Sequence, residues 1–274
     1  MGNGMSNFTD FIGGGGGSAS FPTIFLSKSQ TFVPPQDGNI CIHVIGAGGS
    51  GGASSVSDYS SGAAGGYCKK NTLAVTTSSS FTVVVGAGGA SVRGTSVGNA
   101  GGNTTVAGTG LSATLTANGG AGGRTGANSV GGSASNGDVN NTGGAGIFIG
   151  GGGAVGLTGT GNIGKNNTGL YSGADCDVVG DLWSSSLGQL AGDIGASGVE
   201  RGVNSSEIPP QPYTAGPLAG GGYSRKDITG QFGLMKGGDA TIGGGGGSCD
   251  NSSTGLEAHS GRGGEGIVVI QYIP

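Results

Sequence analysis

The chain has 274 residues, of which 70 are glycine, while only 9% are charged and 5% are aromatic. This composition excludes a conventional globular enzyme, because few large side chains remain for a core and glycine loses more backbone entropy on folding than any other residue. Valine, isoleucine and leucine nevertheless cluster in short alternating runs. We therefore expect a folded chain, stabilised by backbone hydrogen bonds, rather than a disordered one.

Charge and apolar pattern exclude two classes of partner. The formal net charge is −4 and no basic run occurs, which argues against nucleic acid. No stretch of about eighteen apolar residues occurs, so we expect no membrane insertion. The first residues, MGNGMSNFTDFIGGGGGS, show no basic region followed by an apolar one, so we expect no signal peptide.

The chain begins with a polar lead segment, residues 1–20. Within it Phe8, Phe11 and Ile12 are spaced as on one turn of a helix, which predicts a small apolar docking element on a flexible linker. Residues 21–35, FPTIFLSKSQTFVPP, follow as a β-type run. We therefore expect a docking segment that leads into a β-rich part.

Two apolar runs predict single strands. Residues 40–46 read ICIHVIG and alternate in the manner of a strand. Their alternation places Cys41, His43 and Ile45 on one face, and Ile40, Ile42 and Val44 on the other. The run GIVVIQYI at 266–273 is the most apolar in the chain, which predicts a central, buried strand.

Two pairs of runs predict hairpins. YCKKNTLAV at 67–75 and SFTVVVG at 80–86 are joined by TTSS, and Thr and Ser suit short turns between β-rich runs. NTTVAG at 103–108 and LSATLTANGG at 111–120 are separated by a short glycine-containing turn. We expect each pair to form an antiparallel hairpin.

Between about residues 119 and 265 short glycine runs recur at irregular spacing. Strings of glycine adopt the left-handed threefold polyproline II conformation, whose N–H and C=O groups point outward in several directions. Without side chains such helices approach closely and bond to one another, so that buried polar groups are paired. This predicts a bundle of polyglycine helices; the alternative is a flexible linker.

Long inserts separate the glycine runs. They span roughly 154–201, 203–218 and 223–236, and the first contains a possible short helix, DLWSSSLGQL at 181–190. We therefore expect a mainly β and irregular fold, with short strands and hairpins framing a bundle of polyglycine II helices and with little α-helix. The expected organisation is a docking segment at 1–20, a β-rich part at 21–118, and a polyglycine bundle with loop inserts and a closing strand at 119–274.

Cysteine, histidine and acidic residues offer no catalytic or metal site. Cys41, Cys68, Cys176 and Cys249 form no CxxC pair, so we expect buried thiols and no metal. His43 and His259 have no evident partners for a triad, so satisfied or exposed histidines are expected. The aspartates of ADCDVVGD lack the full spacing of a calcium loop, which favours a solvated loop; they are Asp175, Asp177 and Asp181.

A GxGxxG motif follows the first predicted strand, at Gly46 to Gly51. Dinucleotide binding would require a helix directly after it. The sequence continues as GASSVSDYSSGAAGG without helical periodicity, and GAGG recurs at 86–89. We therefore expect no nucleotide and no other cofactor.

The two ends of the glycine-rich region carry a family resemblance. Its motifs are VIGAGGSGG (44–52), GGYCKKNTLAVTT (65–77), FTVVVGAGGA (81–90) and GGEGIVVIQYI (263–273). The chain resembles the glycine-rich domain of bacteriophage tail and tail-fibre proteins over roughly residues 30–274. Its middle is similar to the polyglycine-sandwich adhesins at the tips of some long tail fibres. That resemblance implies a fibre-docking N-terminal part, a polyglycine bundle, and variable distal loops that contact the host receptor.

The resemblance implies a non-enzymatic virion protein at the tip of a tail fibre, extracellular after release. Its expected partners are other virion proteins, through the N-terminal segment, and a host surface glycan or outer-membrane protein. One alternative is a purely structural tail or capsid subunit without receptor contact. A weaker one is a polysaccharide-degrading enzyme, for which the 15 scattered acidic residues offer no evident pair.

The inserts supply the candidate receptor-binding residues. Aromatic side chains on loops of a rigid scaffold suit recognition of sugars or proteins, and a basic side chain suits an anionic group. The candidates are Tyr171, Trp183, Tyr213, Tyr223 and Arg225. The alternative is that each aromatic packs its own loop. We expect them near one end of the particle, away from residues 1–20.

Overall fold

The computed structural model describes residues 22–54, 59–148, 152–157, 159–164, 225–226, 235–240, 242–250 and 258–274; residues 225–226, 235–236 and 250 are described by their backbone alone. The described part consists of β-strands and extended segments, and it contains no helix. The prediction of a mainly β chain is therefore confirmed for these residues. The helix predicted at 181–190 lies outside them.

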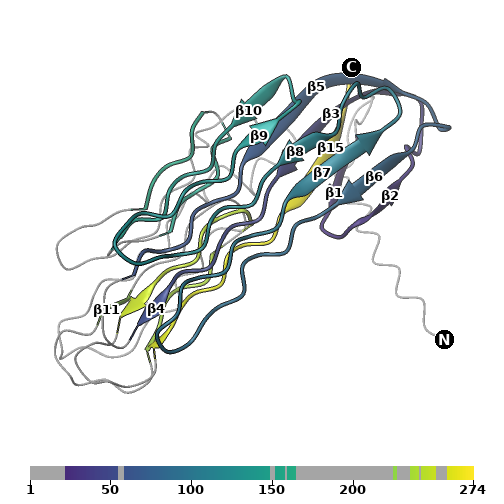
Figure 1. The fold of residues 1–274 in the computed structure, drawn as a ribbon. Helices are drawn as coiled ribbons and strands as arrows, with labels where there is room; N and C mark the ends of the chain where they lie inside the picture. The colour runs from purple at the N-terminus through teal and green to yellow at the C-terminus, as the bar shows by residue number, and fades with distance from the viewer. Residues whose placement is uncertain are drawn as a thin grey trace, which may run out of the picture.

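Ten strands form two antiparallel sheets of five strands each (Figure 1). The first sheet has the spatial order β1 (Thr23–Leu26), β15 (Ile267–Ile273), β3 (Gly38–Ile45), β5 (Tyr67–Val75) and β10 (Val139–Asn141). The second has the order β2 (Gln30–Phe32), β6 (Phe81–Val84), β7 (Thr104–Gly108), β8 (Leu115–Ala117) and β9 (Ala134–Ser135). As predicted, β15 is a central and buried strand, paired with β1 and β3.

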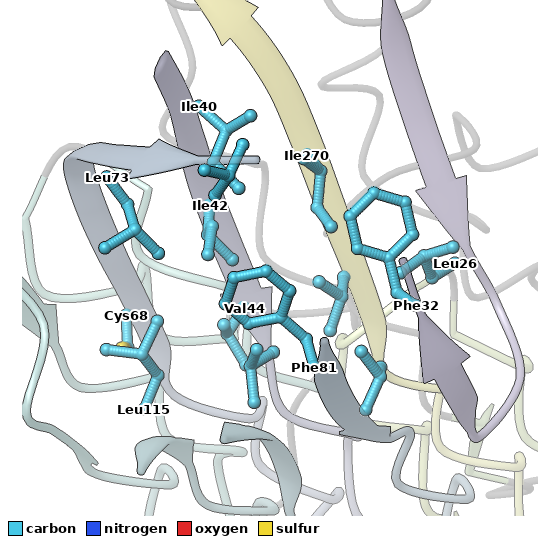
Figure 2. Close-up of a cluster of buried hydrophobic side chains, with 14 of the residues drawn as sticks. Leu26, Phe32, Ile40, Ile42, Val44, Cys68, Leu73, Phe81, Leu115 and Ile270 are labelled. Atoms are coloured by element: carbon cyan, nitrogen blue, oxygen red, sulfur yellow. The ribbon is translucent and has the colours of Figure 1, made fainter. Parts of the chain in front are cut away.

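The main hydrophobic core lies between the two sheets (Figure 2). The first sheet contributes Ile40, Ile42 and Val44 of β3, and the second contributes Phe81 and Leu115. All five side chains are fully buried. The alternation predicted for residues 40–46 is confirmed, because Ile40, Ile42 and Val44 share the core face.

One predicted hairpin is wrong. Strand β5 pairs with β3 and β10, whereas β6 pairs with β2 and β7, so the runs 67–75 and 80–86 lie in different sheets. The turn between them is closed by the Ser79 N–H, which donates to the carbonyl of Thr76 at 2.9 Å, and it carries the chain across the sandwich. Apolar residues of both strands thereby enter one core from opposite sides. The second predicted hairpin is confirmed, since β7 and β8 pair.

Long glycine-rich segments connect the strands and run away from the sheets and back. Figure 1 shows them side by side, ending near β4 (Ala53–Ser54). We call these segments the glycine bundle; its described residues are 46–54, 59–66, 86–103, 118–133, 142–148, 152–157, 159–164, 237–240, 242–250 and 258–266. They come from both sides of residue 118, the boundary predicted between the β-rich part and the bundle.

Backbone hydrogen bonds of the first segment follow a period of three residues. One set of N–H groups donates to the carbonyls of segment 60–66: Gly46 to Gly66, Gly49 to Ala63 and Gly52 to Ser60. A second set donates to the carbonyls of segment 96–102: Ala47 to Gly102, Ser50 to Asn99 and Ala53 to Ser96. A third set donates to the carbonyls of segment 261–264: Gly48 to Gly264 and Gly51 to Gly261. All eight bonds measure 2.8 to 3.1 Å between N and O. Successive N–H groups thus point to three different neighbouring segments, whereas those of a β-strand point to two.

The carbonyl groups of the same segment accept from further neighbours. Ala47 and Ser50 accept from Gly120 and Gly123, Gly49 and Gly52 accept from Gly246 and Cys249, and Gly48 accepts from Gly89. Residues 46–53 therefore have six bonded neighbours: 59–66, 86–89, 96–102, 118–123, 246–249 and 261–264. Bonding on all sides stabilises a region that has few apolar side chains to bury.

Close approach of the backbones explains the glycine content. A Cβ atom added at Gly48 or Gly51 would overlap the carbonyl oxygen of Gly244 or Gly247. Some buried positions instead hold serine, whose hydroxyl accepts a backbone N–H. The hydroxyls of Ser50, Ser60 and Ser129 accept from Asn99, Arg124 and Gly146 at 2.8, 2.9 and 3.1 Å. Small polar side chains thus complete the backbone bonding where glycine is replaced.

Candidate binding surface at the distal end of the glycine bundle

The two ends of the molecule differ in what forms them. The Tyr272 N–H donates to the carbonyl of Pro22 at 3.0 Å, so residue 22 lies at the sandwich end, together with the C-terminus. At the other end, which we call the distal end, the glycine segments turn back (Figure 1). It contains β4 and two turns, residues 90–96 and 124–128, which we call the distal turns. Each contains a glycine with positive φ, Gly94 at 66° and Gly126 at 68°.

Single bridges join the distal turns to their neighbours. Ser96 pairs with Ala53 of β4, and Thr125 pairs with Tyr59. On the far side of the first turn Arg93 pairs with His259. The turns are therefore held at both flanks by backbone contacts, which restricts their conformations.

Short parallel strands bring later parts of the chain to the same end. β13 (Cys249–Asp250) pairs with β4 on one side and with β11 (Arg225–Lys226) on the other. β12 (Met235–Lys236) pairs with β14 (Ala258–His259). The backbone of Arg225, one of the predicted receptor-binding residues, thus lies at the distal end, remote from residue 22.

The exposed charges of the described distal turns are arginines. Arg93 and Arg124 are both exposed. Arg124 donates Nε–H and Nη2–H to the carbonyl of Asn128 at 2.9 and 2.7 Å, which fixes its guanidinium beside the turn. Such a planar group with remaining donors is suited to carboxylate or phosphate oxygens.

His43 belongs to a buried polar cluster in the sandwich rather than to the distal end. Its Nδ1 lies 2.7 Å from the Tyr67 hydroxyl, and its Nε2 lies 3.0 Å from Gln271 Oε1 and 3.3 Å from Cys41 Sγ. Burial, partly opposed by the Gln271 hydrogen bond and reinforced by the charge of Lys69, lowers the pKa of His43 to about 4. The prediction of a satisfied histidine is confirmed, and the imidazole is neutral at neutral pH.

The described cysteines are buried thiols, as predicted for Cys41, Cys68 and Cys249. Burial raises the pKa of Cys41, and it raises the pKa of Cys68 to about 11. Raised values disfavour the thiolate, so neither residue is an activated nucleophile. Cys176 lies outside the described residues.

The GxGxxG motif forms no phosphate-binding loop. Residues Gly46 to Gly51 are extended, and each of their N–H groups donates to a backbone carbonyl of a neighbouring segment. No helix follows within the described residues. The N–H groups that a dinucleotide would need are therefore already used.

Other predicted residues lie outside the described part of the chain. They are the docking residues Phe8, Phe11 and Ile12, the aromatics Tyr171, Trp183, Tyr213 and Tyr223, and the aspartates Asp175, Asp177 and Asp181. Their roles stay predictions. Among the described residues, no group of three His, Cys, Asp or Glu side chains is placed to hold a metal ion. The same residues include no helix long and apolar enough to span a membrane.

The sequence reasoning missed the distal turns with Arg93 and Arg124. A signal was available in the order of the motifs: a strand, a glycine run, a short glycine-poor stretch, another glycine run and a strand. VVVGAGG and AGGNTTV frame the first turn, and TANGGAGG and GGSAS frame the second. The midpoint between two such runs marks the position most distant from the sheets.

Comparison with known proteins shows the family of the chain. A family model described as a glycine-rich domain matches residues 23–273. A search of curated proteins finds no significant match.

Proposed function

The chain belongs to the glycine-rich domain family, and from this membership and the placement of the distal turns we propose that it is a bacteriophage tail-fibre tip adhesin that binds a host cell surface. One observation carries the proposal. The glycine bundle holds the distal turns at the end opposite to residue 22, where the N-terminal segment enters. An attached end and an exposed end are what an adhesin requires.

We propose further that the bundle segments are polyglycine II helices. A polyproline II helix has three residues per turn, so every third N–H points the same way. A second segment repeats the period found at 46–53. Its first set of N–H groups donates to the carbonyls of segment 118–124: Ser60 to Arg124, Ala63 to Ala121 and Gly66 to Asn118. The second set donates to segment 144–147, Ser61 to Ile147 and Ala64 to Gly144, and the third to segment 243–246, Gly62 to Gly246 and Gly65 to Gly243.

A bundle of this kind makes a rigid support for recognition. Turns that are anchored at both ends lose less conformational entropy on binding than free loops do. The inserts with Tyr171, Trp183, Tyr213, Tyr223 and Arg225 would add to the same binding end, while Phe8, Phe11 and Ile12 would dock to the fibre. In this proposal the protein is non-enzymatic and acts by contact alone.

The proposal is tested by cell binding. The fluorescently labelled full chain is incubated with a panel of intact bacteria and bound label is measured by flow cytometry. A variant with serine at positions 93, 95, 124, 125 and 128 alters the distal turns, and a control with serine at 109, 113 and 114 alters the exposed loop between β7 and β8 at the sandwich end. We expect saturable binding to some strains, lost in the first variant and kept in the control.

A second measurement places the chain in a particle. Electron micrographs of virions labelled with an antibody to this chain should show label at the ends of tail fibres. Label on virions together with no cell binding by the purified chain would favour the alternative, a structural subunit without receptor contact. No label on any virion would contradict the phage assignment.

A further inference from the structure

Two cations at the distal end have no acidic partner among the residues that the structure describes. Arg93 and Arg124 are exposed, and the side-chain hydrogen bonds of Arg124 go to the backbone carbonyl of Asn128. The described ion pairs lie elsewhere: Lys70 with Asp138 on the sandwich and Arg262 with Glu265 in the bundle. The whole chain carries a net charge of −4, whereas the charged residues of the two distal turns are both arginines.

The described carboxylates of the bundle are already engaged. Glu265 pairs with Arg262 and also accepts the N–H of Gly88 at 2.9 Å. Asp239 accepts the N–H of Arg262 at 2.7 Å. These carboxylates accept hydrogen bonds from groups within the bundle, so they do not neutralise the arginines of the distal turns.

Backbone contacts place the cations around β4. Ser96, three residues from Arg93, pairs with Ala53. On another side the Gly52 N–H donates to the carbonyl of Ser60 at 3.1 Å, and the Ser60 N–H donates to the carbonyl of Arg124 at 2.9 Å. The strand β11, with Arg225 and Lys226, lies two pairings from β4, or about 10 Å at the usual strand spacing. Cationic residues from three separate passes of the chain therefore reach this end, where β13 also brings Asp250 opposite Lys226.

We propose that the distal end binds an anionic polysaccharide through Arg93 and Arg124; the inference rests on the proposed function and gives its receptor a chemical class. A guanidinium pairs with carboxylate or phosphate oxygens through parallel hydrogen bonds. The turns 90–96 and 124–128 also present Ser91, Thr95, Thr125 and Asn128, all exposed, as partners for sugar hydroxyls.

Taken without the inserts that carry the predicted aromatic residues, the distal turns argue against a protein partner. Protein interfaces depend on buried aromatic or large apolar anchors at their centre. The distal turns read ASVRGTS and RTGAN, with no aromatic residue. Short polar side chains around two arginines match a polymer rich in hydroxyls and anionic groups better than they match a protein surface.

The test measures equilibrium binding of the full chain to immobilised polymers at low and at high salt. The polymers are polygalacturonate, which carries carboxylates, a phosphomannan, which carries phosphates, neutral dextran, and poly-L-glutamate. We expect binding to at least one of the first two, which identifies the anion. Binding should fall at high salt, because exposed charges are screened, and dextran should not bind.

Two matched pairs of substitutions identify the residues. Arg93→Gln with Arg124→Gln should weaken polysaccharide binding at least about tenfold, the loss of one or more charged hydrogen bonds. Lys28→Gln with Lys70→Gln removes the same charge from the sandwich and should leave binding unchanged. Arg93→Lys with Arg124→Lys keeps the charge and should retain measurable binding. Thermal unfolding of each variant checks that it is folded.

Several results would overturn the inference. They are no binding of the wild-type chain to either polyanionic polysaccharide, equal binding to dextran or poly-L-glutamate, or equal loss in the two glutamine variants. The intact-cell assay separates the two proposals. A wild-type chain that binds no cells contradicts the proposed function, whereas a chain whose cell binding survives Arg93→Gln with Arg124→Gln contradicts only this inference.

Discussion

Gly245 lies so close to Gly62 that a Cβ atom added at Gly245 would overlap the carbonyl oxygen of Gly62. That oxygen belongs to a bonded segment and cannot move alone, since the Gly62 N–H donates to Gly246 and its carbonyl accepts from Gly153. The glycine at this position is therefore required by space, and not by an unusual backbone angle, because its φ is not positive.

Gly245→Ala should destabilise the protein by about 3 kcal/mol or more, the upper part of the usual range for overpacking. Gly159 is the matched control, because it lies in the same bundle, lacks a positive φ, and has no atom within 4 Å of an added Cβ. Gly159→Ala should change stability by at most about 0.5 kcal/mol. Urea unfolding of both variants gives the comparison, and equal effects would show that the segments do not pack as described.

Stability should fall as the pH decreases through the range set by His43. The folded-state pKa is about 4, below the unfolded value of 6.5, so the unfolded chain binds the proton first. The contribution of neutral His43 is complete above about pH 6.5, declines as the pH falls, and is lost near pH 4, with a total of about 3 kcal/mol. Urea unfolding across this range measures it.

His43→Gln supplies the control for the pH effect. Without the imidazole the slope of unfolding free energy between about pH 6.5 and pH 4 should flatten, although the variant is less stable throughout. An unchanged slope would assign the pH dependence to other groups. Asp138, whose pKa is lowered by its hydrogen bond to Lys70, titrates below this range.

Phe32 and Phe81 should be energetically coupled, because they face each other across the β2–β6 pairing with ring centroids 6.2 Å apart. A double-mutant cycle with Phe32→Leu and Phe81→Leu should give a coupling energy of about 0.5–1.5 kcal/mol. The control cycle pairs Phe32→Leu with Tyr67→Phe, since Tyr67 packs in a different cluster. That pair should be additive, and coupling of equal size in both cycles would contradict the sheet order.

The strands could be predicted from the sequence where alternation alone decides. Ile40, Ile42 and Val44 share a face because side chains of a strand alternate, and this face is the core face. Alternation does not say which strand lies next to which. The TTSS turn after Val75 therefore predicts a hairpin, although in the structure it crosses between the sheets and both strands bury their apolar face in one core.

The bundle could be predicted in outline, and the order of the motifs marks the distal turns, but the common position of their two arginines could not be predicted. Glycine runs imply close backbone approach, and the overlap at Gly48 and Gly51 agrees with it. Arg93 and Arg124 look in the sequence like isolated cations in Gly/Ser stretches. Their common position depends on segments of matched length that run out and back, which is a property of the three-dimensional arrangement.

Hydrogen exchange of residues 46–53 and 59–66 tests most directly whether the glycine bundle is a rigid support. Their N–H groups donate to backbone carbonyls on several sides, so we expect them to exchange as slowly as the central strands β3 and β15. Exposed amides at the distal turns should exchange faster and serve as the internal reference. Exchange of residues 46–53 at the rate of an unstructured peptide would show a flexible linker, and it would contradict the bundle and the adhesin built on it.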